Sequence, residues 1–417
     1  MITPRTVDFR TRSVGYAEFI DPVQFVDDLA PVRVQSNGAA AGRGLVRAGL
    51  PSLTLQVDRR ALTFTTDDQG RLVVEPRRSG HLVVDLEPEA FSDLVQDVAS
   101  TFGLQMAGRA SVRHGSADDF LAWEPILRCL LDGRPLYAGG DVELCDQGGA
   151  PLDLDRSFAL DDDPDEIGHF LAEAGYLHLR AVFSEEEMAA VSADLDDAML
   201  AAAPDDGASW WARTEAGEQY PARILGFNTW SSPLRELLHS ARFQRIGTFT
   251  EDRFVQRDPE VGDSAEGLLK KIGVVEGMSD VSWHKDCALG GHSRGCCGLT
   301  VGISVTGAGR ENGELGVMAG SHRANLPLLG VEGVDLPRVP LPTRTGDVTV
   351  HCSCTFHMSR PPVSAERKVV YTGFGLAPRA GDRPLEVDPA EARRARAELG
   401  GRDRRLPEIT RSSSFEL

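Results

Sequence analysis

The sequence predicts an α+β protein in which a smaller α/β domain precedes a larger domain of antiparallel strands. Its 417 residues exceed what one ordinary hydrophobic core accommodates. Short β-rich runs and a helical run fill residues 44–136, and between Leu268 and Leu376 short strands alternate with Gly-rich turns, as in an antiparallel barrel or jelly roll. We therefore expect an N-terminal domain at 1–140, a linker at 141–165, a second domain at 166–376 and a charged tail at 377–417.

The N-terminal domain is predicted from runs of β-branched and apolar residues. Four strands are expected, at Leu53–Val57, Ala61–Thr65, Arg71–Glu75 and His81–Asp85. A helix follows over Pro88–Phe102. Together with Gly70-Arg-Leu-Val-Val and a segment at 107–116 that leads into a helix near Phe120, this pattern resembles the sterol-carrier-like fold, over roughly ninety residues and without a chemical motif. The resemblance implies either an apolar tunnel or a unit that packs against its neighbour, and we prefer the second.

Composition changes twice before the second domain begins. Residues 141–165 are rich in Asp, Gly and Pro, which is typical of a linker. A helix is then expected over Asp165–Ala174 and a strand over Tyr176–Arg180. Ser184 is followed three residues later by Glu187, the pattern of a capping box, so another helix should begin there.

The charge balance bears on the class of partner. The chain has 44 Lys and Arg against 63 Asp and Glu, a formal net charge of −19, which repels phosphate backbones and anionic membranes. No apolar run approaches the roughly 18 residues that span a bilayer, and residues 1–19 lack the pattern of a secretory signal. We expect a cytoplasmic protein with a small-molecule substrate and no nucleic-acid or membrane partner; the sequence leaves its oligomeric state open.

The segment Val281-Ser-Trp-His-Lys-Asp286 carries the chemistry. In a strand the side chains at i and i+2 project from one face, so His284 and Asp286 can reach the same ion. A third ligand should come from another strand, and His357 lies near the end of one. Two histidines and one carboxylate on one face of a metal leave three positions open, as in Fe(II) oxygenases.

Residues 166–376 resemble the phytanoyl-CoA dioxygenase family, whose members are cupin-like enzymes with a double-stranded β-helix (jelly-roll) domain. Half of the chain is covered, and the motifs fall in the family's order, although Ala319 stands where the family usually has Pro. The matching segments are Phe170-Leu-Ala-Glu-Ala-Gly-Tyr-Leu-His-Leu179, Phe183-Ser-Glu-Glu-Glu187, Trp283-His-Lys-Asp286, Asn312-Gly-Glu-Leu-Gly-Val-Met-Ala-Gly-Ser-His322, Gly346-Asp347, His357-x-Ser359 and Arg367.

The resemblance implies an Fe(II)-dependent dioxygenase that consumes O2 and the co-substrate 2-oxoglutarate and releases succinate and CO2. His284, Asp286 and His357 would bind the iron, while Arg367, assisted by Ser359, would grip the far carboxylate of 2-oxoglutarate. Apart from the resemblance, Lys271 and its neighbour Lys270 are candidates to orient that co-substrate; the alternative, and the commoner outcome, is a solvated charge pair. Related halogenases carry a small residue in place of the ligand carboxylate, so an intact Asp286 favours oxygenation, most simply the hydroxylation of a small-molecule or lipid-like metabolite.

Several alternatives stay open at this point. His351 is the rival third ligand, but it lies sixteen residues before Arg367 rather than ten and lacks the H-x-S pattern, so we prefer His357. His292 and His322 are expected in loops or in hydrogen bonds around the site. Other classes of function are a non-catalytic small-molecule binding protein with a vestigial metal site and a zinc-dependent cupin-type lyase or isomerase.

Three tryptophans precede the core strands in a Gly-rich and polar stretch, at Trp210, Trp211 and Trp230. They are candidates for a substrate lid, or else they anchor the loop. The sequence does not separate these two roles.

Overall fold

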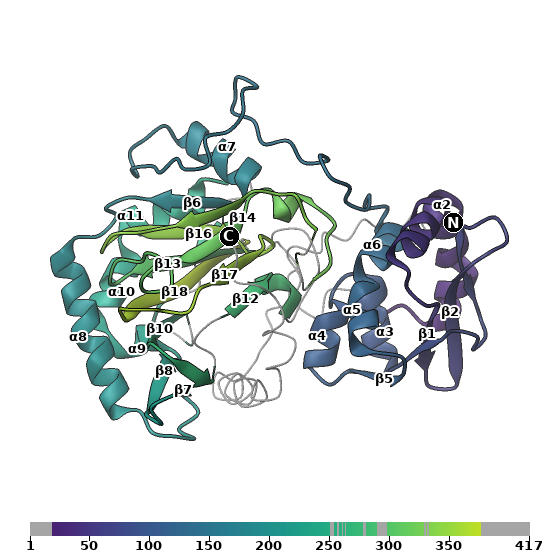
Figure 1. The fold of residues 1–417 in the computed structure, drawn as a ribbon, viewed down its shortest axis with the longest axis horizontal. Helices are drawn as coiled ribbons and strands as arrows, with labels where there is room; N and C mark the ends of the chain where they lie inside the picture. The colour runs from purple at the N-terminus through teal and green to yellow at the C-terminus, as the bar shows by residue number, and fades with distance from the viewer. Residues whose placement is uncertain are drawn as a thin grey trace.

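The computed structural model describes residues 19–376, apart from 251–253, 257, 261, 263, 278–280, 290–297, 329–330 and 332. The predicted tail at 377–417 and His292 therefore lie outside the described residues. Within these limits the chain forms two lobes, a smaller N-terminal lobe and a larger lobe, joined by a long extended segment (Figure 1). No helix among the described residues is long and apolar enough to cross a membrane.

The N-terminal lobe is built on one five-stranded sheet of order β3-β2-β1-β4-β5, in which β1 and β4 run parallel and the other neighbours antiparallel. The expected strands are confirmed. The elements are α1 Pro22–Gln24, η2 Phe25–Leu29, α2 Ala30–Ala48, β1 Leu53–Val57, β2 Arg60–Thr66, β3 Leu72–Glu75, β4 Leu82–Leu86, α3 Pro88–Val95, α4 Thr101–Met106, β5 Ala110–His114, α5 Ala117–Ala122 and α6 Glu124–Asp132.

The helix predicted over Pro88–Phe102 is broken into α3 and α4. Between them Asp97 adopts φ +58°, and its buried carboxylate pairs with Arg134 at 2.6 Å and with Arg128 at 3.7 Å. Ser100 then caps α4 by accepting a hydrogen bond from the backbone of Gly103. These tertiary ion pairs override the helical spacing of the sequence. The resemblance of this lobe to the sterol-carrier-like fold stays a prediction.

Two antiparallel sheets form the larger lobe, as expected for a jelly roll. In its described part the major sheet has the order β11-β7-β8-β10-β18-β13-β16-β6 with β9 beside β18, and the minor sheet has the order β12-β17-β14-β15. The strands are β6 Tyr176–Leu179, β7 Ser209–Thr214, β8 Gln219–Ile224, β9 Phe254–Gln256, β10 Ala265–Lys270, β11 Val274–Glu276, β12 Val281–His284, β13 Gly298–Ser304, β14 Leu315–Met318, β15 Arg338–Leu341, β16 Val348–Cys352, β17 His357–Ser359 and β18 Arg367–Leu376.

Side chains alternate along the major sheet and so give it an apolar face and a polar face. On β13, Leu299, Val301 and Ile303 enter the main core together with the helices that cover this outer face. Thr300, between them, projects to the inner face, toward the minor sheet. The covering helices, seen at the left of Figure 1 or above the sheet, are α7 Pro164–Ala174, α8 Glu185–Ala201, α9 Phe227–Trp230, α10 Ser232–His239 and α11 Ala241–Gln244, with the short helix η3 Arg245–Thr248. The predicted capping box of Ser184 and Glu187 begins α8.

A second, smaller core covers the outer face of the minor sheet. It contains Trp283, Phe356 and Met358 of the sheet region, and Leu326 and its neighbours from the segment after η5 Ser321–Arg323. Tyr137, from the end of the predicted N-terminal domain, and Val142, from the predicted linker, are partly buried and pack against this core. The linker is therefore packed against the larger lobe rather than loose. We call residues 137–158 the strap.

Both the strap and the N-terminal lobe make direct contacts with the larger lobe. Phe158 of the strap is fully buried in the main core and pairs with Leu179. Asn325 donates a hydrogen bond to the carbonyl oxygen of Pro125 in α6 at 3.0 Å, and α4 packs beside η4 Asp286–Leu289. The strap overlaps the predicted linker 141–165, and its apolar residues pack against the larger lobe.

Candidate metal centre

Two neighbouring strands of the minor sheet bring the two predicted histidine ligands together. His284 ends β12 and His357 begins β17, and the two residues are direct partners in the antiparallel register, with ring centroids 4.1 Å apart. Asp286 is not in the strand, as the sequence suggested, but is the first residue of η4. This turn brings Asp286 Oδ1 to 3.5 Å from His284 Nε2 and 3.4 Å from His357 Nε2.

The ring orientation of both histidines suits a metal ligand. His284 Nδ1 lies 2.7 Å from the carbonyl oxygen of Ser282, and His357 Nδ1 lies 3.0 Å from that of Thr355. Because a carbonyl only accepts, each Nδ1 donates to it, and Nε2 is the ring nitrogen that a neutral histidine would offer to a metal on the side of Asp286.

The three donors also have the right separation for one ion. The donor atoms of His284, Asp286 and His357 lie within 4.8 Å of one another. Ligand bonds of roughly 2.0–2.2 Å that meet at a right angle place two donors roughly 3 Å apart, close to the separations found. The donor set therefore fits an Fe(II) ion bound on one face by two histidines and a carboxylate. His351 is not in this group, although its Nε2 lies 3.5 Å from Asp286 Oδ2.

The protonation states agree with cation binding. Burial raises the pKa of the Asp286 carboxyl, but the charge of His357 and the close approach of His284, His351 and His357 outweigh it, so this pKa lies well below its ordinary value. Burial, and then the charge of His357, lower the pKa of His284. An ionised carboxylate beside a neutral imidazole is the pair that a divalent metal requires.

A corner rich in positive charge adjoins the centre along β17. Lys270 and Arg367 are direct partners on β10 and β18, and both are almost completely buried. Lys270 Nζ donates to Ser359 Oγ at 2.7 Å, two residues along the strand from His357. Arg367 Nη1 donates to the carbonyl oxygen of Gly313 at 2.5 Å, and Nη2 to the hydroxyl of Tyr371 at 3.3 Å.

The assignment of Lys271 is corrected by this arrangement. Its Nζ pairs with Glu218 at 2.6 Å and lies over the ring of Tyr220, away from Ser359 and Arg367. Since side chains alternate along β10, only one of two adjacent lysines can face the inner side, and that lysine is Lys270.

Several motif residues serve the scaffold rather than the chemistry. The Asn312 side chain accepts a hydrogen bond from the backbone N–H of Gly309 and donates one to the carbonyl oxygen of Gly307, and so shapes the turn. In the same turn Gly313 adopts φ +79°, and its carbonyl oxygen accepts the hydrogen bond from Arg367. Asp347 accepts hydrogen bonds from His178 and from the backbone of Ala181.

The Ser321-His322 pair, also part of a motif, is likewise structural. The backbone N–H of Phe356 donates to Ser321 Oγ at 2.8 Å, just before the predicted ligand His357. His322 Nε2 lies 3.0 Å from the carbonyl oxygen of Ala172, and burial lowers the pKa of His322 to about 4. His322 thus ties α7 to η5 as a neutral side chain.

Among the three predicted lid residues, Trp210 lies on the inner side of the major sheet. The guanidinium of Arg223 lies 4.6 Å from the Trp210 ring and pairs with Glu266 at 2.8 Å, and Glu266 faces Tyr371 across β10 and β18. The neighbouring Trp211 donates its indole N–H to Ser209 instead.

Trp230 belongs to the other side of the sheet. It ends α9, which packs on the outer face, since a Cβ atom on Gly267 of β10 would lie 3.1 Å from Phe227. Trp230 is 51% exposed. The three tryptophans therefore do not form one lid, and Trp230 is withdrawn as a candidate.

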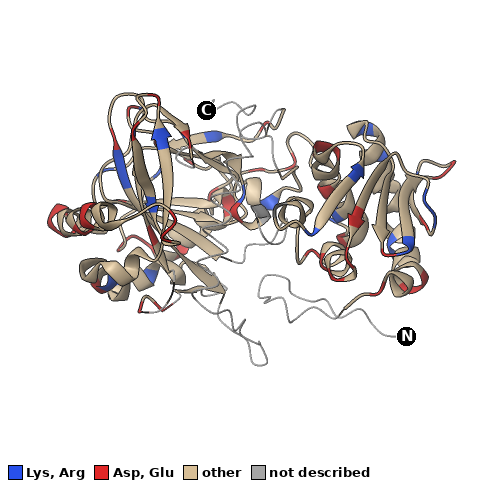
Figure 2. Cartoon of the chain, turned by 90° about the horizontal axis from the view of Figure 1, so that it is seen from below, with Lys and Arg blue, Asp and Glu red and all other residues tan. Residues whose placement is uncertain are grey.

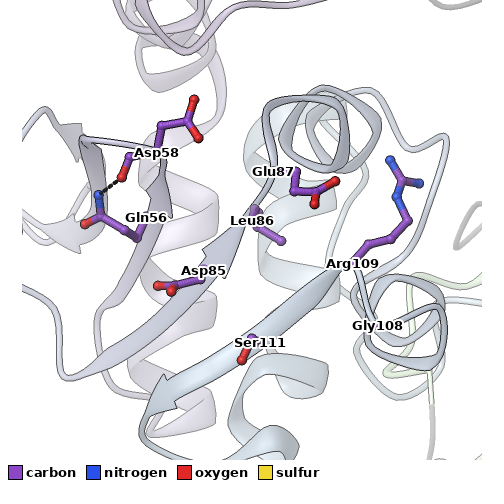
Figure 3. A pocket seen from close by; sticks show the side chains of 8 residues that line it. All are labelled: Gln56, Asp58, Asp85, Leu86, Glu87, Gly108, Arg109 and Ser111. Carbon is purple, nitrogen blue, oxygen red and sulfur yellow. Dashed lines mark hydrogen bonds between the residues drawn. The ribbon is translucent and has the colours of Figure 1, made fainter.

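Of the cavities among the described residues, one adjoins the Arg367 corner and another lies on the N-terminal lobe. A small one, of about 10 Å³, is lined by Arg367, Tyr371 and Thr349 among others. A larger hollow of about 300 Å³ lies on the N-terminal lobe, where Asp58, Asp85, Glu87 and Arg109 surround it without a metal-binding group of the kind above (Figure 3). Acidic residues are spread over both lobes (Figure 2).

Comparison with known proteins identifies the larger lobe. Residues 171–370 match the model of the family described as phytanoyl-CoA dioxygenase (PhyH). They form a PhyH family domain. Its span contains every predicted ligand and the Arg367 corner. The protein is therefore a 2-oxoglutarate-dependent non-haem iron oxygenase, with Fe(II), 2-oxoglutarate and O2 as its cofactors and co-substrates. Among curated proteins, none matches the chain.

Solved structures similar to the chain cover about half of it. AviO1 from Streptomyces viridochromogenes Tue57 is 21% identical and covers 53% of this chain and 97% of its own, with a TM-score of 0.41. The 2-oxoglutarate-dependent carbocyclase SnoK of nogalamycin biosynthesis is 21% identical, over 56% and 98%, with a TM-score of 0.41. EctD from S. alaskensis is 17% identical, over 55% and 86%, with a TM-score of 0.43.

Proposed function

We propose that the protein hydroxylates a small-molecule or lipid-like metabolite and couples this to conversion of 2-oxoglutarate into succinate and CO2, with His284, Asp286 and His357 as the iron ligands. The observation that carries the proposal is the convergence of these donors within 4.8 Å, each histidine presenting Nε2. When bound, iron supplies the redox chemistry that joins co-substrate decarboxylation to substrate oxidation.

The charged corner supports 2-oxoglutarate as the co-substrate. Two residues of an extended strand span roughly 7 Å, comparable to the length of an extended five-carbon dicarboxylate. A molecule that chelates the metal beside His357 can therefore reach Ser359, Lys270 and Arg367 with its far carboxylate. Because Arg367 and Lys270 are buried, their charge-assisted contacts would orient the co-substrate and exclude water from its distal end.

The carboxylate of Asp286 supports hydroxylation over halogenation. An iron site that adds a halide to its substrate must leave room for a halide ion among its ligands, whereas here an ionised side chain fills that place beside both histidines. The open positions then serve the co-substrate and O2.

A product screen tests this proposal. Candidate metabolites are incubated with the Fe(II)-loaded protein, 2-oxoglutarate and O2, and the screen follows succinate release and substrate mass. We expect a substrate that accelerates succinate formation and gains one oxygen atom. A halogenated product, or tight zinc binding without any effect of 2-oxoglutarate, would contradict the proposal; the second result would favour a zinc-dependent lyase or isomerase.

A further inference from the structure

The two carboxylate oxygens of Asp286 have different surroundings. Oδ1 faces the two histidine ligands, at 3.5 Å from His284 Nε2 and 3.4 Å from His357 Nε2. Oδ2 turns the other way and accepts a hydrogen bond from the hydroxyl of Thr300 at 2.6 Å. One carboxylate oxygen is thus placed to bind a cation, and the other is hydrogen-bonded to the protein.

Thr300 reaches Asp286 from the opposite sheet, together with a second residue. Thr300 and His351 are direct partners in the antiparallel pairing of β13 with β16, so their side chains lie next to each other on the inner face. His351 Nε2 is 3.5 Å from the same Asp286 Oδ2. His351 is 1% exposed, and within the described part of the chain neither of its ring nitrogens has a hydrogen-bond partner. Both side chains therefore converge on a single carboxylate oxygen.

The different roles of the two Asp286 oxygens matter because an octahedral ion has a limited number of coordination positions. A facial set of two histidines and a carboxylate that uses one oxygen occupies three positions of an octahedron. A bidentate 2-oxoglutarate needs two more, which leaves one for O2. If Asp286 bound through both oxygens, it would take a fourth position, and the co-substrate and O2 would compete for what remained.

We propose that Thr300, with His351 beside it, is a positioning residue that holds Asp286 Oδ2 away from the metal, so that Asp286 binds through Oδ1 alone and leaves room for both co-substrates. The inference rests on the proposed metal site. Thr300 is suited to the role because an ionised carboxylate only accepts hydrogen bonds and the threonine hydroxyl can donate. Since Thr300 comes from a strand other than those of the ligands, it also ties η4 to the major sheet.

Variants of Thr300 test the proposal through metal and co-substrate binding rather than turnover. Thr300→Val removes the hydroxyl at nearly constant volume, Thr300→Ala repeats the test if the valine variant fails to fold, and Thr300→Ser restores the donor. Thr372→Val is the matched control, because Thr372 is a buried threonine on β18 whose hydroxyl bonds the carbonyl oxygen of Ser264 on the outer side of the sheet. Fe(II) affinity is measured anaerobically by competition with a chelator, and 2-oxoglutarate affinity at saturating iron.

Loss of a side chain that orients a metal ligand typically weakens metal affinity by about 10–100-fold. We expect that loss in Thr300→Val and Thr300→Ala, together with weaker 2-oxoglutarate binding at saturating iron, and near-normal values in Thr300→Ser and Thr372→Val. Normal binding in Thr300→Val, or an equal loss in Thr372→Val, would overturn the inference and leave the proposed function standing. If the unaltered protein binds neither iron nor 2-oxoglutarate, both fail.

Discussion

Removal of the Arg367 guanidinium should weaken 2-oxoglutarate binding and leave the iron in place. Arg367 is 4% exposed, and its Nη atoms are fixed by Gly313 and Tyr371, whereas its Nε is buried and has no partner among the described residues. A charge-assisted bidentate contact contributes about 1.5–3 kcal/mol. Since 1.4 kcal/mol corresponds to a factor of ten, Arg367→Ala should lose about 10–100-fold in affinity.

Two further variants separate charge from geometry. Arg367→Lys keeps the charge but not the planar fork, so its loss should be smaller than that of Arg367→Ala. Lys368→Ala is the matched control, because this neighbouring cation points to the outer side and pairs with Asp196 at 2.6 Å. The assay is an anaerobic titration of 2-oxoglutarate into the Fe(II)-loaded protein, with iron content measured in parallel. Unchanged affinity in Arg367→Ala with full iron content would refute the anchor, and a loss of iron would show that Arg367 supports the metal ligands instead.

Three other predictions use pairs of matched changes. His357→Ala should abolish tight iron binding, whereas His351→Ala should retain iron with reduced affinity, and the reverse ranking in a metal titration would show that the third ligand is misassigned. Lys270→Met should weaken 2-oxoglutarate binding in the same titration, but Lys271→Met should not, so equal effects would contradict the assignment of the inner lysine. A fragment that begins at residue 161 lacks the strap and should unfold at a lower urea concentration than one that begins at residue 135; equal midpoints by circular dichroism would mean that the strap adds nothing to stability.

The candidate ligand set could be predicted from the sequence because part of its signal is local. His284 and Asp286 are two residues apart, and His357 stands ten residues before an arginine that returns on the next strand. The capping box at Ser184 is equally local, and the structure confirms it. Short spacing identifies these residues as candidates, whereas the pairing of β12 with β17 is what brings His284 beside His357.

Other features depend on pairing between distant segments. The sequence does not show which face of β10 each residue occupies, so Lys271 was assigned to the site. The register of β10 with β18 instead places Lys270 on the inner face, opposite Arg367. The break between α3 and α4 comes from ion pairs of Asp97 with arginines on and after α6, which helical periodicity does not contain. Thr300 carries no motif, and its role appears only when β13 is aligned beside β16 opposite Asp286.

The packing of the segment between the two predicted domains is also not visible in its composition. The strap has the Asp, Gly and Pro content of a linker, yet Tyr137, Val142 and Phe158 pack into the two cores of the larger lobe. A few apolar side chains in a polar segment contribute little to composition, but burial of one large side chain contributes about 1.5–3 kcal/mol.

The central claim is tested most directly by adding Fe(II) and 2-oxoglutarate together to the full-length protein without oxygen. A chelated co-substrate on iron held by His284, Asp286 and His357 should give a weak visible charge-transfer band that neither component gives alone. The band should be absent in Asp286→Ala. Admission of O2 should then bleach it and release succinate. If the unaltered protein shows neither the band nor succinate, it does not use these residues as an iron and 2-oxoglutarate site.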